Sequence, residues 1–474
     1  MSNSPNVLLL LTDQERYDMS APDGPAVRTT GLDRLQSEGM RFDRAYTPIS
    51  ICTSARASLL TGLYPHNHGM LNNCHGPEAV LPNLLEDLPT FSQLLKDNGY
   101  ETSYVGKWHL GREQGPEHFG FDHYTGSDSN VLDDTLREHH KSIGIDSSSI
   151  ELTDRLYTDY TEDPTLISAT LPIPPESTRM HYYTDLTIDR LQQYAESETT
   201  FLHRLDYPGP HHPYVLPEPY ASMYDPDDID PWPTCVETFA GKPDLHERQP
   251  ANQGVSSFGW DQWAEAVSKY FGYISFINDE IERVLDALDE FELAENTVVV
   301  HTTDHGGFIG DHRQFNKGPL MYEETYHIPL IVRWPGVVEP GTVCTDLVRL
   351  HDLMPTILDI AGLETPDRAD SRSFRPLLEG TAPAEWPQSL FAEYHGDEFG
   401  FYSQRMVVTD RYKYVHNAFG IDELYDHGTD PHELHNLIDH PEYETSRREL
   451  RETLLGWMKS TGDPFFEWTA KILR

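Results

Sequence analysis

The feature that most constrains this sequence is a repeated alternation between short apolar or β-branched runs and longer stretches with helical spacing. Strands are expected at residues 6–12, 41–45, 101–105, 199–204, 297–303 and 329–332. Helices are expected at 30–39, from Cys52 onward, and at 88–98, 184–197, 262–290 (one helix or two) and 352–361. Strands that alternate with helices pair in parallel and are covered on both faces. We therefore predict an α/β fold with a mostly parallel sheet covered by helices on both faces.

The chain changes character after about residue 375. Short strands are expected at 406–408 and 412–416, and a terminal helix at 446–459. We predict a larger domain over residues 1–375 and a smaller C-terminal α+β subdomain with an antiparallel sheet over residues 376–474. Two polar stretches, about 125–180 and 215–255, interrupt the alternation. Such excursions in α/β enzymes often wall the substrate pocket, and we expect the same of these two.

The formal net charge of −43 excludes some classes of partner. A strongly acidic surface repels nucleic acid and anionic membranes, so we expect neither as a partner. Only nine of the 35 basic residues are lysine, and carboxylates are dense. This composition favours a protein that stays soluble in very high salt, where self-repulsion is screened. An ordinary acidic cytosolic enzyme is the alternative.

The cysteines and apolar segments indicate a cytoplasmic protein. The N-terminal apolar run, residues 6–11, is too short to span a membrane and is not followed by a cleavage pattern, so it is interpreted as a buried strand. Cys52, Cys74, Cys235 and Cys344 are widely separated and form no CxxC motif. That spacing is typical of a reducing compartment rather than a disulfide framework.

Polar residues stand where several of the expected strands end. In a parallel sheet these carboxyl ends and the loops after them form the ligand crevice. A lone Asp at such a position is explained by a helix cap or a turn. The joint placement of two carboxylates, an amide and an imidazole instead predicts a divalent-metal site. These residues are Asp13, Gln14, Asp304 and His305, and the other strand-end groups are Lys107, His109 and the segment 206–212.

Cys52 is expected to open a helix, with Arg56 one turn later on the same face. The positive end of the helix dipole and the guanidinium both favour an anionic nucleophile or ligand at Cys52. A small, buried and inert cysteine is the alternative. The spacing by itself leaves both interpretations open.

Five segments together resemble the type I sulfatases of the alkaline phosphatase superfamily, in the order that the family has them. Residues 52–62 (CTSARASLLTG) resemble the signature C-x-P-S-R-x-x-x-L-T-G, and residues 99–111 resemble the second signature. The segments 210–214 (PHHPY) and 303–324 are similar to the family's histidine loop and its metal-and-lysine segment. Residues 423–437 resemble the end of its C-terminal subdomain. The resemblance spans nearly the whole chain.

This resemblance implies an alkaline-phosphatase-like fold and a sulfatase that hydrolyses a sulfate monoester. In the family the motif cysteine is oxidised to formylglycine by a maturation enzyme, and the aldehyde hydrate attacks sulfur. Carried onto this chain, the nucleophile derives from Cys52, and one divalent metal is held by Asp13, Gln14, Asp304 and His305 together with residue 52. The same comparison assigns charge neutralisation to Arg56, Lys107 and Lys317, the general acid to His211 with Lys317, and the general base to His109.

Two positions depart from the family pattern. Ser54 stands where the family prefers Pro or Ala, and Ala55 replaces the usual Ser. We still expect conversion of Cys52, because the other motifs are present. The Asp-Gln and Asp-His pairs resemble those of choline sulfatases and phosphonate monoester hydrolases, where manganese is found. Calcium and manganese both remain open as the metal.

Rival functions on the same residues are a phosphodiesterase or phosphonate monoester hydrolase, and a non-catalytic protein that binds sulfate esters. Sulfate and phosphate groups are close in size and geometry, so the fold and core residues leave the first rival open. A complete acid–base set argues against the second. The predicted small-molecule ester has a sugar, an aryl group or a small alcohol such as choline as its leaving group, and a homo-oligomer remains open.

Overall fold

The computed structural model describes residues 4–125, 134–160, 162–381, 383–397, 400–418 and 420–473. Of the predicted excursion at 125–180, residues 126–133 and 161 lie outside the described residues. Within the described ranges, no helix combines the length and the apolar composition needed to cross a bilayer.

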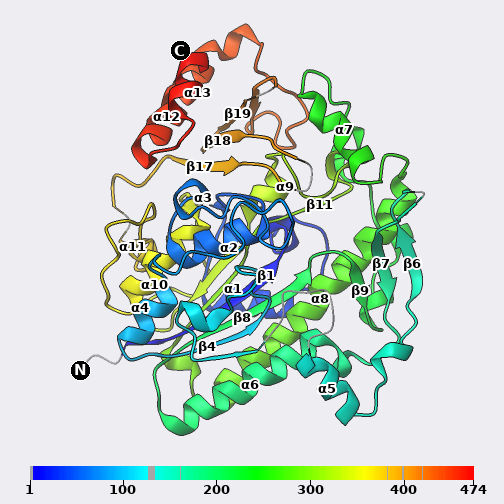
Figure 1. The fold of residues 1–474 in the computed structure, drawn as a ribbon, viewed down its shortest axis with the longest axis vertical. Coiled ribbons are helices and arrows are strands. Elements are labelled where there is room, and N and C mark those ends of the chain that lie inside the picture. Colours follow the sequence, from blue (N-terminus) through cyan, green and yellow to red (C-terminus); the bar gives the residue numbers. More distant parts are fainter. Residues whose placement is uncertain are drawn as a thin grey trace.

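An eight-stranded sheet forms the centre of the molecule (Figure 1). Its order is β15 (Thr342–Cys344), β2 (Met40–Phe42), β14 (Leu330–Arg333), β10 (Thr297–Thr303), β1 (Asn6–Asp13), β8 (Phe201–Pro210), β4 (Glu101–Gly106) and β5 (His123–Thr125). β14 runs antiparallel to its neighbours β10 and β2, and the remaining pairs are parallel. The predicted mostly parallel sheet is confirmed.

Strand β1 separates two hydrophobic cores. Val7, Leu9 and Leu11 belong to the core under helices α2 (Cys52–Thr61), α4 (Phe91–Asp97) and α10 (Leu353–Ile360). Leu8 and Leu10 point the other way, into the core under α1 (Thr30–Glu38), α6 (Arg179–Ser197) and α8 (Trp260–Glu290). Because successive side chains of a strand face opposite sides, a run of apolar residues requires cover on both faces. The predicted helical cover of both faces is confirmed.

The C-terminal part forms a four-stranded antiparallel sheet, as predicted. Its strands are β17 (Ser389–Tyr394), β18 (Gln404–Thr409), β19 (Tyr412–Asn417) and β20 (Glu423–Asp426). Helices α12 (Glu444–Thr461) and α13 (Phe466–Leu473) follow, and Trp457 of α12 stacks on Phe391 with ring centroids 5.0 Å apart. This part lies at the top of Figure 1. The division at residue 375 stays a prediction.

Smaller elements complete the fold. The three-stranded sheet of β6 (Thr153–Tyr157), β7 (Leu166–Thr170) and β9 (Tyr214–Leu216) joins residues of the two predicted excursions, and α5 (Asp134–Ser142) and α7 (Asp244–Asn252) lie in the same regions. The remaining short elements are β3 (Ala45–Tyr46), β11 (Phe308–Ile309), β12 (Phe315–Asn316), β13 (His327–Ile328), β16 (Val348–Arg349), α3 (Pro65–His68), α9 (Glu323–Tyr326) and α11 (Arg375–Leu378).

Some element boundaries differ from the sequence prediction. The strand predicted at 199–204 starts at Phe201 and runs on to Pro210, with a shift of register against β1 between Leu11 and Asp13. The helix predicted at 184–197 begins five residues earlier, because the Thr178 side chain caps it by accepting from the backbone N–H of His181. The strand predicted at 41–45 is divided between β2 and β3, which belong to different sheets. Residues 262–290 lie in one continuous helix, α8.

Candidate functional site

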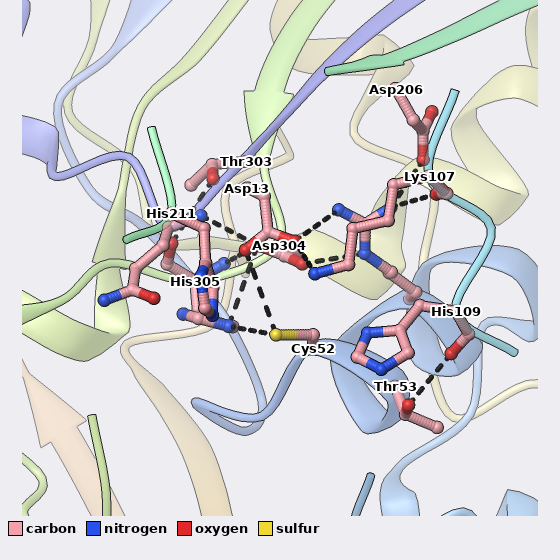
Figure 2. Close-up of polar contacts among 12 residues, drawn as sticks. Asp13, Cys52, Thr53, Lys107, His109, Asp206, His211, Thr303, Asp304 and His305 are labelled. Atoms are coloured by element: carbon pink, nitrogen blue, oxygen red, sulfur yellow. Dashed lines mark hydrogen bonds and ion pairs between the residues drawn. The ribbon is translucent and has the colours of Figure 1, made fainter. Parts of the chain in front are cut away.

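The carboxyl ends of β1 and β10 and the start of α2 meet at one point (Figure 2). The ligand-type atoms of Asp13, Cys52, Asp304 and His305 all lie within 4.8 Å of one another, and all four residues are buried. Parallel pairing of β1 with β10 brings the two Asp residues together, since Thr12 pairs with Thr303 directly before them. Four side chains from three elements therefore form a compact candidate metal site.

Cys52 is the first residue of α2, as predicted, and its Sγ lies 3.1 Å from His305 Nε2 and 3.9 Å from Asp13 Oδ1. The expected preference for an anion is not met by the unmodified thiol. Burial, followed by the neighbouring Asp13 carboxylate, raises the pKa of Cys52 to about 12. Loss of water and a nearby negative charge outweigh the helix dipole. An unmodified Cys52 is therefore a neutral thiol near pH 7.

His305 presents an acceptor nitrogen to this cluster. Its Nδ1 lies 2.7 Å from the carbonyl oxygen of Gly306, so Nδ1 carries the proton and donates it to that oxygen. Nε2 is left with a lone pair directed toward Cys52, as Figure 2 shows. A histidine oriented in this way by a backbone carbonyl is the usual form of a metal-bound imidazole.

Gln14 supplies a further oxygen that fits a cation. Its side-chain Oε1 is buried and has no hydrogen-bond partner among the described residues. The residue adopts a left-handed φ of 67°, and a Cβ at Gly307 would lie 2.3 Å from Gln14 Nε2. The left-handed backbone at Gln14 and the lack of a side chain at Gly307 therefore position the Gln14 amide, whose oxygen has no hydrogen-bond partner among the described residues. The oxygens of Asp13, Gln14 and Asp304 with the nitrogen of His305 suit one divalent cation.

Arg56 binds three carboxylates and does not line the cavity. Its side chain is fully buried, with Nε 2.8 Å from Asp304 Oδ2, Nη1 2.8 Å from Asp206 Oδ2 and Nη2 3.1 Å from Asp13 Oδ2. The guanidinium thus orients one oxygen of each metal-site aspartate. Burial opposes ionisation of Asp13, but the neighbouring cations, Lys107 first and then Arg56, hold the pKa of this carboxyl well below its usual range.

Asp206 is a member of the site that the sequence analysis placed only within a segment. It lies inside β8 rather than after it, and both of its oxygens accept from Arg204 at 2.7 Å. The side chains of Asp206 and Arg204 are fully buried. Two opposite charges, two residues apart within a strand expected to be buried, were the available signal, because buried charges must be paired.

Lys107 connects the metal site to the cavity. Its Nζ donates to Asp13 Oδ2, and 12% of its side chain is exposed. The chain turns into Lys107 at Gly106, which has a φ of 119° and where a Cβ would lie 1.9 Å from the carbonyl oxygen of Asp206. A cation is thus placed beside Cys52 by a turn that only glycine permits.

His211 and Lys317 form a pair. Lys317 Nζ lies 3.0 Å from His211 Nε2 and donates to it, while His211 Nδ1 donates to the carbonyl oxygen of His212 at 2.6 Å. Burial, followed by the charge of Lys317, lowers the pKa of His211 well below its usual value. The pair therefore consists of an ammonium and a neutral imidazole that can exchange a proton across one hydrogen bond.

His109 lies on the other side of Cys52 from His305 in the view of Figure 2. Its backbone has a left-handed φ of 57°, and its carbonyl oxygen accepts from Thr53 Oγ1 at 2.8 Å. Burial, followed by the charge of Lys107, lowers the pKa of His109 well below its usual value. A neutral imidazole is thereby held next to residue 52.

A cavity of about 730 Å³ opens onto this cluster. Its lining includes five of the predicted catalytic residues: Cys52, Lys107, His109, His211 and Lys317. The sixth, Arg56, lies behind them among the carboxylates. The structure therefore brings all the predicted site residues to one place, with Arg56 in a different setting from that expected.

Comparison with known families gives two matches. Residues 5–363 match the family described as Sulfatase. Residues 310–460 match the family described as N-sulphoglucosamine sulphohydrolase, C-terminal. The two matches together cover nearly the whole chain.

Individual relatives agree with these matches. The uncharacterized sulfatase YidJ of Escherichia coli (strain K12) is 31% identical over 487 residues, covering 99% of this chain and 90% of that protein. An arylsulfatase of Clostridium perfringens (strain 13 / Type A) is 28% identical, covering 95% of this chain and 94% of that protein. The solved phosphonate monoester hydrolase SpPMH from Silicibacter pomeroyi has a TM-score of 0.83 at 25% identity and covers 96% of both chains.

Proposed function

Because this chain belongs to the sulfatase family, we propose that it hydrolyses a sulfate monoester to an alcohol and inorganic sulfate. The resemblance to type I sulfatases predicted from the motifs is confirmed by the family match. One observation carries the proposal for this chain. Cys52 belongs to the four-residue metal cluster and also lines a cavity together with Lys107 and Lys317, although the whole chain has a net charge of −43. A cationic cavity in so acidic a protein is suited to an anionic group.

The nucleophile of the proposed reaction is the formylglycine hydrate made from Cys52 by a maturation enzyme. One hydrate oxygen bonds to sulfur while the bond between sulfur and the alcohol oxygen breaks. The second hydroxyl then expels sulfate and restores the aldehyde, so no incoming water has to attack the covalent intermediate. The position of Cys52 at the start of α2, within the metal cluster and on the cavity wall, supports this assignment.

Asp13, Gln14, Asp304 and His305 hold the divalent metal in this proposal. When bound, the metal supplies Lewis-acid polarisation of the sulfate oxygens and lowers the pKa of the nucleophile. The orphaned Gln14 Oε1 and the oriented His305 Nε2 support the ligand set. An imidazole ligand favours manganese over calcium.

Proton transfer is assigned to two histidines. Lys317 transfers a proton to His211 Nε2 across their 3.0 Å contact, and the imidazolium formed in this way protonates the departing alcohol. His109 accepts a proton from the second hydroxyl of residue 52, for which a neutral imidazole is required. Lys107 and Lys317 offset the negative charge of the transferring group. Arg56 positions the aspartates, because its nitrogens already bind Asp13, Asp206 and Asp304.

A phosphodiesterase or phosphonate monoester hydrolase is the second candidate. The fold shared with SpPMH and the Asp-Gln and Asp-His pairs favour it. Turnover of an aryl sulfate and of the matching aryl phosphodiester by one metal-loaded preparation separates the two. We expect the larger kcat/KM for the sulfate, and a strong preference for the diester would overturn the sulfatase proposal. Absence of turnover of either ester, with metal bound and residue 52 converted, would instead favour the sulfate-ester-binding protein.

We also propose a cytoplasmic location. All four cysteines lie in the described part of the chain, and none forms a disulfide, which suits a reducing compartment. Fractionation of cells of the native host checks this, and recovery of the protein outside the cytoplasm would contradict it.

A further inference from the structure

The cavity that contains Cys52 has two chemically different parts. Around Cys52 the lining is cationic and imidazole-rich. Away from Cys52 it is dominated by apolar side chains from the segment 150–173, from β9 and from α8. Five of them are half-buried, so they keep surface toward the cavity: Ile150, Leu152, Leu171, Ile173 and Val215. A sulfate group fills only a small part of 730 Å³, so this second part receives the alcohol.

Two polar side chains of the second part, His140 and Thr178, are already bonded to protein. The two ring nitrogens of His140 lie 2.7 Å from Ser147 Oγ and 2.6 Å from the carbonyl oxygen of Ser177. Thr178 Oγ1 donates to the carbonyl oxygen of Pro175 at 2.8 Å. A sugar would bring several hydroxyls to this wall, and each one desolvated without a partner weakens binding.

Charge is also sparse there. Among the described lining residues, Glu78 and Arg179 are the only charged side chains besides Lys107 and Lys317 at the sulfate end. An alcohol with several charged groups therefore has few ionic partners. The lining matches an alcohol whose body is hydrocarbon.

The apolar wall is fixed by backbone pairing. The N–H of Leu171 donates to the carbonyl oxygen of Leu216 at 2.7 Å, directly after the parallel pairing of β7 with β9. The N–H of Ile173 donates to the carbonyl oxygen of Leu171 at 2.9 Å. The wall is thus formed before substrate arrives, and a preformed apolar surface binds with little ordering cost.

We propose that the sulfated alcohol is an alkyl or aryl alcohol whose hydrocarbon body packs on this wall, an inference that rests on the sulfatase activity proposed above. Burial of each added methylene increases kcat/KM by up to about fourfold, because apolar burial contributes about 0.8 kcal/mol per methylene. Leu152 and Ile173 then determine specificity without taking part in the reaction.

The test uses the converted, metal-loaded full chain and a series of primary alkyl sulfates from methyl to hexyl, kept below their micelle concentrations. Glucosamine 6-sulfate is the polar comparison. We expect kcat/KM to rise about two- to fourfold per methylene and hexyl sulfate to exceed the sugar sulfate. Ile173→Asn and Leu152→Asn should each flatten the chain-length dependence of kcat/KM. Val236→Asn, at a residue 70% exposed and outside the cavity lining, is the matched control.

A thermal unfolding transition shows whether each variant is folded. Two separate wall positions are used so that the test remains possible if one variant does not fold. Turnover of the series without chain-length dependence, or a higher kcat/KM for the sugar sulfate, would overturn this inference and leave the sulfatase proposal standing. Retention of the full chain-length dependence in both folded wall variants would also overturn it. Failure to turn over any sulfate ester would overturn both proposals together.

Discussion

Neighbouring groups hold the side chains of the site and determine which atom of each side chain faces the candidate metal position. The carbonyl oxygen of Gly306 fixes the proton of His305 on Nδ1, which leaves Nε2 as the ligand atom. Gly307 leaves room for the Gln14 amide, whose Oε1 remains without a partner among the described residues. Such support lowers the cost of organising a metal site, since little has to move when the ion binds.

Gln14→Ala should weaken binding of the metal by at least about tenfold, because it removes one oxygen of the ligand set. Titration of metal-free protein with Mn²⁺ or Ca²⁺ measures the dissociation constant. Gln14→Glu keeps an oxygen at the same place and should bind at least as tightly as the original chain. Gln192→Ala, on the exposed face of α6, is the control. An unchanged dissociation constant in Gln14→Ala would remove Gln14 from the ligand set.

His211→Gln should lower kcat/KM by about 10²–10⁴-fold for an ester with a poor leaving group. The loss should be much smaller for nitrophenyl sulfate, because a nitrophenolate departs without protonation. Steady-state kinetics with both esters gives the ratio, and His118→Gln at an exposed position is the control. An equal loss for both esters would show that His211 is not the general acid.

At the level of elements, buried ion pairs connect β8, α2 and the ends of β1 and β10. Arg204 binds Asp206 within β8, Asp206 binds Arg56 of α2, and Arg56 binds Asp304 after β10. All four side chains are fully buried. Removal of one member leaves an uncompensated charge in the interior, and such a change is strongly destabilising.

Asp206→Asn should therefore lower the free energy of unfolding by about 3–5 kcal/mol, because Arg56 and Arg204 both lose a charged partner. Denaturant unfolding with the metal bound measures it. Asp410 pairs with Arg44, and the Asp410 side chain is 88% exposed. Asp410→Asn should therefore change the free energy of unfolding by less than about 1 kcal/mol. Equal effects of the two substitutions would contradict the structural role given to Asp206.

At the scale of the whole molecule, one hydrophobic core joins the central sheet to the C-terminal sheet. Val7 and Leu9 of β1 belong to the same cluster as Leu390 of β17 and Val408 of β18. The folded chain carries a net charge of −43. Mutual repulsion of so many carboxylates is reduced by salt, because the screening length falls to about 3 Å at 1 M.

The midpoint temperature of unfolding should therefore rise from dilute buffer to multimolar KCl. Repulsion destabilises the compact state, and screening removes that penalty. Thermal scans at fixed pH and fixed metal concentration measure the change, with NaCl as a second salt to separate screening from a specific ion. A midpoint that is constant or falls with salt would favour the ordinary acidic enzyme over the salt-adapted one.

The sequence was sufficient to predict the sheet, its helical cover and the meeting of Asp13 with Asp304, because these follow from local periodicity and from parallel strand ends. It did not predict the ion pairs of Arg56, whose partners Asp206 and Asp304 lie 150 and 248 residues away along the chain. The spacing around Cys52 left a nucleophile and an inert cysteine both open, and only the fold shows the Asp13 carboxylate beside the thiol. Pairing of distant charges is a property of the folded chain and leaves little local signal.

The proposed nucleophile is tested most directly by the mass of the peptide that contains residue 52, from protein made in its native host. We predict an aldehyde at this position, with Ser54 and Ala55 accepted by the maturation enzyme. A mass that corresponds to an intact cysteine thiol in all of the protein would contradict the proposed nucleophile and, with it, the reaction assigned to this site.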